Sequence, residues 1–139
     1  MADLVVTASQ VLPDTTYDIR RGIAAAAITA GQVVCLDPTT LTVKLFDAND
    51  TAVNQLTPGI ALCGASAGQP VSWQEAAGAQ VTIGAGAAPA NGAVYVASAT
   101  PGGIGAVADL TTGWVRAIVG IGVTGNKIKL IGGNSLITG

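Results

Sequence analysis

Apolar and polar residues alternate along most of the chain in short stretches, and small turn-forming residues separate these stretches. A period of two is typical of β-strands that have one buried face. The clearest example is 41–46, where Leu41, Val43 and Leu45 share one face of the predicted strand. Further strands are predicted within 33–37, 57–64, 70–75, 78–86, 93–98, 113–123 and 127–133. Short strands at this spacing predict an all-β fold, either a small β-barrel or a sandwich.

Three segments are less regular. The alanine-rich "GIAAAAIT" (22–29) has helical propensity, but its flanking glycine and its two isoleucines favour a strand. The segment 47–56 has room for one helical turn, with Asn49 or Asp50 as its N-cap. The stretch "TPGGIGAV" (100–107) is interpreted as a glycine-rich connection.

Residues 1–21 differ from the rest of the chain. They hold five of its charged residues (six Lys and Arg and eight Asp and Glu in all) and a proline, and they contain no hairpin signal. We therefore expect an extended N-terminal arm over 1–21, with a short strand near Leu4–Thr7, followed by one β domain over 22–139.

Charged residues are scarce. They make up 10% of the 139 residues, against about 25% in an average soluble domain. Between Asp50 and Asp109 the only charged residue is Glu75. A single chain rarely exposes so much uncharged surface, so we expect other subunits to cover part of it.

Several classes of function are disfavoured by the same pattern. No apolar stretch reaches the 18 residues of a membrane-spanning helix, and the first residues lack the basic region of a signal peptide. The net charge of −2 and the lack of a basic patch argue against direct nucleic-acid binding, which depends on Lys and Arg.

The sequence "GASAG" (64–68) matches the nucleophile motif G-x-S-x-G, with Ser66 at its centre. The chain has no histidine, so a base for Ser66 would have to be Lys44, Lys127 or Lys129. A helix should follow the motif, but "QPVSWQE" has strand alternation instead. We interpret Ser66 as part of a turn between two strands, and expect no enzymatic activity.

The other motifs point to structure as well. "GIGVTG" (120–125) matches the dinucleotide fingerprint G-x-G-x-x-G, but a strand follows it, and Asn126 separates Gly125 from Lys127, which also excludes a P-loop. Cys35 and Cys63 lie in apolar runs and are interpreted as buried free thiols, although a disulfide remains open. Two cysteines without histidine do not predict a metal site, and we expect no cofactor.

Three segments together carry a resemblance to a known family: "ITAGQVVCLD" (28–37), "GIALCGASAGQPV" (59–71) and "VYVASATPGGI" (94–104). In their order and spacing the chain resembles the capsid cement, or head-decoration, proteins of tailed double-stranded-DNA phages, a family formerly described as a phage domain of unknown function. The resemblance covers nearly the whole chain from Gly22, and the N-terminal "MADLVVTASQV" also fits it.

The resemblance implies a β-rich structural protein of the virion. Such a protein is made in the host cytoplasm, binds the outer surface of the head, often as a homotrimer, and holds neighbouring major capsid subunits together. The family brings no catalytic motif to this chain. The alternative is a small β-barrel module of a phage tail or baseplate that binds a ligand or carbohydrate, although Trp73, Tyr95 and Trp114 are few and scattered.

Two sets of residues are candidates for the contacts with partners. The arm carries five apolar residues that we expect to bind the capsid by adding a strand to a sheet edge: Leu4, Val5, Val6, Val11 and Leu12. In that case a chain starting near Tyr17 should stay folded but no longer bind heads. The alternative is that Leu4–Thr7 forms an edge strand of the protein's own barrel, in which case the shortened chain should unfold or aggregate. The strand 113–123 has two largely apolar faces, so we expect Trp114 and Arg116 in a subunit interface.

Overall fold

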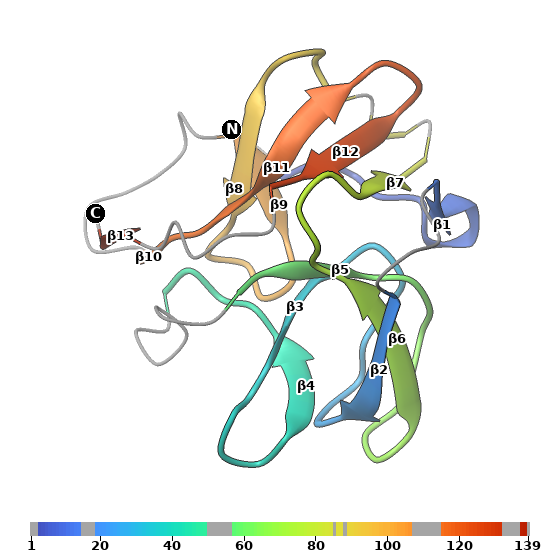
Figure 1. The fold of residues 1–139 in the computed structure, drawn as a ribbon, viewed down its shortest axis with the longest axis vertical. Coiled ribbons are helices and arrows are strands. Elements are labelled where there is room, and N and C mark those ends of the chain that lie inside the picture. Colours follow the sequence, from blue (N-terminus) through green and yellow to red (C-terminus); the bar gives the residue numbers. More distant parts are fainter. Residues whose placement is uncertain are drawn as a thin grey trace.

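The computed structural model describes residues 3–14, 19–49, 57–84, 86–87, 89–106, 115–131 and 137–138. In this part of the chain the fold is all-β, as the alternation predicts, apart from a single turn of 3-10 helix at Ala8–Gln10. A closed barrel lies at one end of the molecule and an open sheet at the other (Figure 1). The uncertain segment 47–56 is described only as far as Asn49, so its expected helical turn lies largely outside the described residues.

The barrel has five strands in the order β2-β4-β3-β5-β6. Antiparallel pairing of β2 with β6, from Ile19 opposite Gln74 to Ile23 opposite Pro70, closes it. The pairing of β2 with β4 is parallel. The bounds are β2 Ile19–Ala24, β3 Val33–Leu36, β4 Thr42–Leu45, β5 Gly59–Ala61 and β6 Pro70–Gln74.

The second part, here called the upper sheet, has six strands in the order β1-β7-β12-β11-β8-β9. A separate pair joins β10 to β13. The bounds are β1 Leu12–Pro13, β7 Gln80–Thr82, β8 Val94–Ala97, β9 Ile104–Ala106, β10 Val115–Arg116, β11 Ile118–Val123, β12 Lys127–Leu130 and β13 Ile137–Thr138.

Strands β3 and β5 contribute to two hydrophobic cores at once. Along β3, Val33 and Cys35 face the core shared with the upper sheet, whereas Val34 faces the barrel interior. In β5, Ile60 and Ala61 divide between the two cores in the same way. Alternate residues of a strand point to opposite sides. Because a core covers each side of β3 and β5, all five side chains are fully buried. The barrel and the upper sheet therefore share a middle layer.

Trp73 is the largest side chain in the barrel interior and is only 2% exposed. Two glycines make room for its ring. A Cβ added at Gly59 would lie 2.8 Å from Trp73 Cδ1, and one added at Gly22 would lie 3.2 Å from Cζ3. The indole Nε1 donates a hydrogen bond to Glu75 Oε2 (3.3 Å), so its polar atom is satisfied.

The structure corrects several predicted element bounds. Strand β2 begins at Ile19 and so crosses the expected boundary between arm and domain, while only 22–24 of "GIAAAAIT" are in a strand. The expected connection 100–107 contains strand β9. The predicted long strand 113–123 is divided into β10 and β11 in its described part.

A β-bulge in β11 also changes which residues share a face. Ile118 lies opposite Val96 and Gly120 opposite Tyr95, so β11 holds one extra residue at this point. In an uninterrupted strand over 113–123, Val115, Ala117, Val119 and Ile121 would share one face. Ala117 and Val119 are buried, but Ile121 is only half-buried, since a bulge shifts the alternation by one residue.

Candidate functional site

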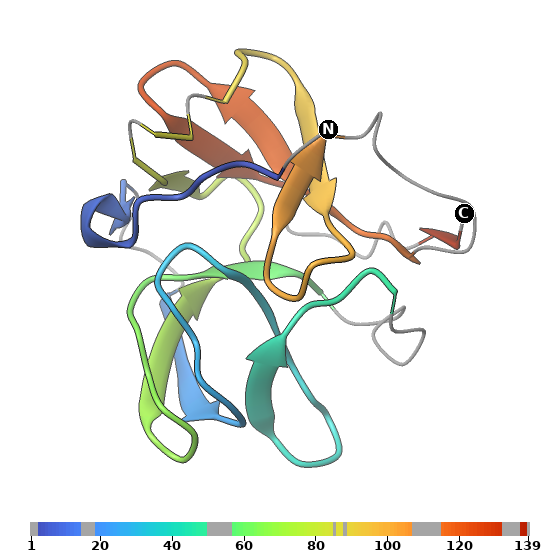
Figure 2. The ribbon, with the colours of Figure 1, turned by 180° about the vertical axis from the view of Figure 1, so that it is seen from behind.

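Residues 3–14, here called the N-terminal strap, cross the upper sheet from one edge to the other. At one end the Leu4 N–H donates a hydrogen bond to the Ile104 carbonyl in β9 (2.8 Å). At the other end Leu12, in β1, pairs with Thr82 of β7. Figure 2 shows the strap in dark blue, running from beside β9 to the single helical turn. The strap thus joins the two edges of the sheet.

This arrangement corrects the expectation of an arm that stands apart from the domain. Val11 is 6% exposed and belongs to the shared core. Leu4 and Val6 are partly buried and pack against that core. Apart from the turn at Ala8–Gln10, the strap takes its backbone hydrogen-bond partners from the strands of the upper sheet and the residues next to them.

Two apolar side chains of the strap point to solvent instead. Val5 is 70% exposed and Leu12 is 63% exposed. Of the five arm residues predicted to bind a partner, the structure thus brings three to the protein's own core and leaves these two on the surface. Val5 and Leu12 form the candidate contact surface.

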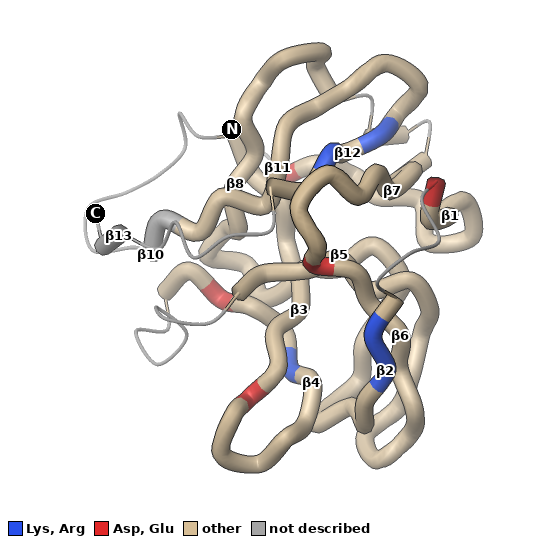
Figure 3. The backbone as a smooth tube through the Cα atoms, viewed as in Figure 1, with Lys and Arg blue, Asp and Glu red and all other residues tan. Residues whose placement is uncertain are grey.

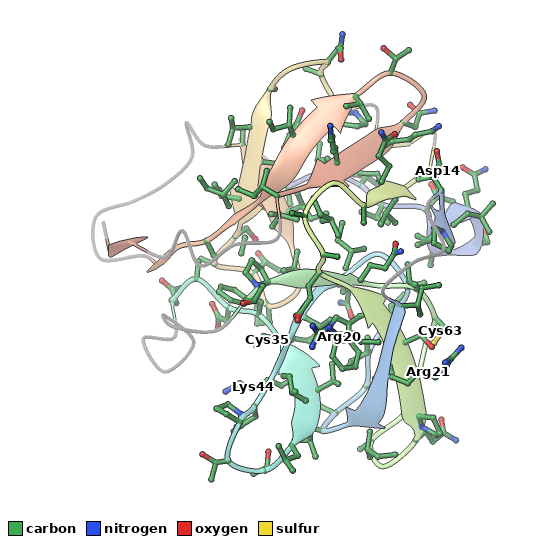
Figure 4. All side chains as sticks on the ribbon, in the orientation of Figure 1. Asp14, Arg20, Arg21, Cys35, Lys44 and Cys63 are labelled. Atoms are coloured by element: carbon green, nitrogen blue, oxygen red, sulfur yellow. The ribbon has the colours of Figure 1, made fainter. Side chains whose placement is uncertain are left out.

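Polar contacts fasten both ends of the strap. Near its start the Ser98 hydroxyl donates to Asp3 Oδ2 (2.8 Å). At its end Asp14 forms an ion pair with Lys127 of β12 and accepts a hydrogen bond from the Thr82 hydroxyl (3.0 Å). Figure 4 labels Asp14 at the rim of the upper sheet. The hydrogen bond from Lys127, with a smaller contribution from Thr82, holds the pKa of Asp14 below its ordinary value of 3.8.

The lowered pKa of Asp14 predicts a pH-dependent stability. The ionised carboxylate stabilises the fold above pH 3.8, and this contribution is lost as the pH falls through the lower, folded-state pKa. At pH 7 Asp14→Asn should lower the free energy of unfolding by about 0.5–1 kcal/mol, the range of a partly exposed ion pair. Toward pH 2 the difference between the two proteins in urea denaturation should become smaller, because the carboxylate becomes protonated. Equal losses at both pH values would contradict an electrostatic role.

Ser66 lies in an exposed turn between β5 and β6. Its N–H donates to Gln69 Oε1 (2.9 Å), and its carbonyl accepts from the Gln69 N–H (3.0 Å). Strand β6 begins at Pro70, as expected, where a hydrolase motif would need a helix. Two of the lysines considered as bases pair with carboxylates elsewhere, Lys44 with Asp37 (3.8 Å) and Lys127 with Asp14.

Replacing Ser66 with alanine should therefore have little effect. The hydrogen bonds at this turn use the backbone of Ser66, so Ser66→Ala should change the free energy of unfolding by less than about 0.5 kcal/mol. Incubation with a fluorophosphonate probe should leave the protein unlabelled by mass spectrometry. Stoichiometric labelling at Ser66 would overturn the structural interpretation.

The glycines of the fingerprint-like motif and the two cysteines lie within or beside strands of the fold. Gly120 and Gly122 lie inside β11, and a Cβ at Gly120 would lie 2.7 Å from Ile128 Cγ2, so the glycine permits close strand packing. Cys35 is a buried free thiol, as expected, whereas Cys63 is free but half-buried and accepts a hydrogen bond from the Ser72 N–H (3.3 Å; Figure 4).

Charged positions are scattered over both parts of the molecule (Figure 3). Among the residues that the structure describes, no three His, Cys, Asp or Glu side chains gather in a group that could hold a metal ion. In the same part of the chain, no helix has the length and apolarity needed to cross a membrane.

The predicted subunit-interface residues are only partly visible. Trp114 lies outside the described residues, and Arg116 is placed in β10 by its backbone, opposite Ile137 of β13. Their role stays a prediction.

The sequence interpretation overlooked a pocket of about 290 Å³ beside the strap. Three segments line it: the first half of the strap, the β2–β3 loop and the β8–β9 loop. The one signal in the sequence was "TPGG" (100–103), a turn whose glycines let other segments approach closely.

Comparison with known proteins adds no relative, since no family model and no curated protein matches this sequence.

Proposed function

We propose that this chain is a structural, non-enzymatic protein of a phage virion that binds the outer surface of the head and stabilises contacts between major capsid subunits. The resemblance of its sequence to head-decoration proteins supports the proposal. The single structural observation that carries it is the exposure of Val5 (70%) and Leu12 (63%) on a strap that is held to the core by Val11, Leu4 and Val6.

The strap suits this role because it is already ordered. A segment that folds only on binding has to offset the cost of its own ordering, whereas a strap held at both ends presents Val5 and Leu12 in fixed positions. The scarcity of charge supports the same role, since a protein among capsid subunits has much of its surface covered. As part of the proposal the protein acts on the head as a homotrimer.

Binding to expanded heads tests the proposal. The purified protein should bind heads that lack it, with a saturable and symmetric copy number. A double substitution, Val5→Asp with Leu12→Asp, should weaken binding by at least about tenfold, because each change places a charge in an apolar contact. The fraction bound is measured by co-sedimentation, and the copy number from averaged electron micrographs.

Leu41→Asp is the matched control. Leu41 is 67% exposed, like Val5, but precedes β4 in the barrel, away from the strap. The Leu41→Asp variant should bind heads as tightly as the unchanged protein does. Heads that take up the double variant normally would refute the strap surface, and a protein that never saturates heads would refute the proposed function.

The alternative of a carbohydrate-binding module gains no support from the described aromatic residues. Trp73 is 2% exposed and Tyr95 is 7% exposed, so neither presents its ring for stacking on a sugar. The hydroxyl of Tyr95 instead accepts a hydrogen bond from the Ala90 N–H (2.8 Å).

A further inference from the structure

The pocket beside the strap combines apolar walls with hydrogen-bond acceptors. Leu4, Val6 and Pro101 supply apolar surface. Asp3 enters from the strap, and Gln32 from the β2–β3 loop. Its volume of about 290 Å³ is far too small for a folded segment, but it is sufficient for one long side chain.

The carboxylate of Asp3 is fixed in place by its neighbours. The Ser98 hydroxyl donates to its Oδ2 (2.8 Å), and the same hydroxyl accepts from the Thr100 N–H (3.1 Å). A carboxylate has about four acceptor positions, and the hydrogen bond from Ser98 uses one of them. Among the described side chains, no ion pair joins Asp3 to a lysine or arginine.

Glycines bring the three segments of the pocket together. A Cβ at Gly103 would collide with both Asp3 Oδ2 and Ser98 Oγ, and one at Gly31 would collide with Val6 Cγ1. Gly31 and Gly102 also have positive φ angles, +90° and +78°. Because side chains are excluded at these positions, backbone packs directly against the strap and holds Asp3 at the pocket.

Gln32 adds a second acceptor to the lining, from the β2–β3 loop. Its Oε1 accepts a hydrogen bond from the Thr29 N–H (2.8 Å), which orients the amide and fixes the position of that oxygen. The residues that line the pocket therefore include a carboxylate from the strap and an amide oxygen from the β2–β3 loop.

We propose that this pocket receives an arginine side chain from a partner polypeptide. Guanidinium carries five N–H donors in a planar fork, which suits two acceptors from different segments better than the compact ammonium of lysine. The aliphatic stem of arginine packs against apolar surface such as that of Leu4, Val6 and Pro101. The net charge of −2 favours a cationic partner.

That the partner is a capsid subunit rests on the proposed function, but the pocket can be tested without heads. The ¹⁵N-labelled protein is titrated at low ionic strength with the peptide acetyl-Gly-Arg-Gly-amide and followed by NMR. Saturable shifts are expected at the backbone amides of 3–8, 29–32, 100 and 102–104. The peptide with citrulline, a neutral group of nearly the same shape, should bind at least about tenfold more weakly than the arginine peptide. The lysine peptide should also bind more weakly than the arginine peptide, but by a smaller factor.

Asp3→Asn is the informative protein variant. The asparagine oxygen still accepts from Ser98, so the fold should be kept, but the charge is gone. Binding of the arginine peptide should weaken at least about tenfold, the loss expected for a charge-assisted contact. Asp37→Asn is the control, since Asp37 lies in the β3–β4 loop and pairs with Lys44. It should leave binding unchanged.

Any of three binding results would overturn the inference. They are equal binding of the citrulline peptide, equal or tighter binding of the lysine peptide, and undiminished binding by the Asp3→Asn variant. Shifts scattered over the whole surface would also overturn it. Head binding that fails while the peptide binds as expected would contradict only the proposed function, and the reverse result would contradict only the pocket.

Discussion

Deleting residues 1–14 should destabilise the whole protein rather than remove a dispensable arm. The deletion takes away Val11 from the shared core, together with the packing of Leu4 and Val6. Losing one buried and two partly buried apolar side chains should lower the free energy of unfolding by about 3–6 kcal/mol, a large part of the stability of an ordinary domain. The melting temperature should fall by at least about 10 °C. This replaces the expectation, from the sequence alone, that a chain starting near Tyr17 stays folded.

The measurement is thermal unfolding followed by circular dichroism, with aggregation monitored alongside. The double variant Val5→Asp, Leu12→Asp is the control, because both side chains are exposed and its melting temperature should change little. If the truncated protein has the same melting temperature as the full-length chain, the strap contributes no stability. That result would restore the interpretation of 1–14 as a separate binding arm.

Trp73→Ala should lower the free energy of unfolding by about 3–5 kcal/mol, the range for removing a large buried aromatic side chain. The ring fills the barrel interior between Gly22 and Gly59, and the backbone of closed strands cannot collapse into the space that it leaves. The substitution also removes the donor to Glu75, whose Oε1 remains paired with Arg20 Nε (3.2 Å). Chemical denaturation at pH 7 gives the free energy of unfolding.

Two further variants separate the contribution of volume from that of the hydrogen bond. Trp73→Phe keeps most of the ring and should cost clearly less than Trp73→Ala. Gly59→Ala leaves the tryptophan in place but puts a Cβ 2.6 Å from the Gln74 carbonyl oxygen and 2.8 Å from the ring, and should also destabilise. If Trp73→Ala and Trp73→Phe cost the same, the lost hydrogen bond, and not the cavity, sets the effect.

The alternation in the sequence predicted much of the fold because most strands have one face in a core. The predicted strands at 33–37, 41–46, 70–75, 93–98 and 127–133 correspond to β3, β4, β6, β8 and β12. Strand β9 was missed, since two of its neighbours in "GGIGA" are glycines and glycine obscures a period of two. The bulge in β11 was missed because one extra residue leaves no mark in composition.

The candidate site was harder to predict than the fold. Apolar residues in the strap were recognised, but their division into Val11 inside and Val5 outside depends on sheet edges formed by residues far along the chain. The pocket depends on the same contacts. Asp3 and Gln32 have nothing in common in the sequence, and they line one pocket only because glycines let the strap lie against two loops.

The closure of the upper sheet by the strap has a consequence for how the protein is made. The contact between Asp3 and Ser98 joins residues 95 positions apart, and that between Asp14 and Thr82 joins residues 68 positions apart. At a synthesis rate of about 5–20 residues per second, the strap waits roughly 5–20 seconds for its partners to be translated. During that interval Val11 has no core to enter, and each newly made strand edge stays open to other chains. The nascent chain is therefore most prone to aggregate before β11 and β12 are made, because these two strands lie between β7 and β8 in the sheet. Slow, non-local pairing should limit its folding rate.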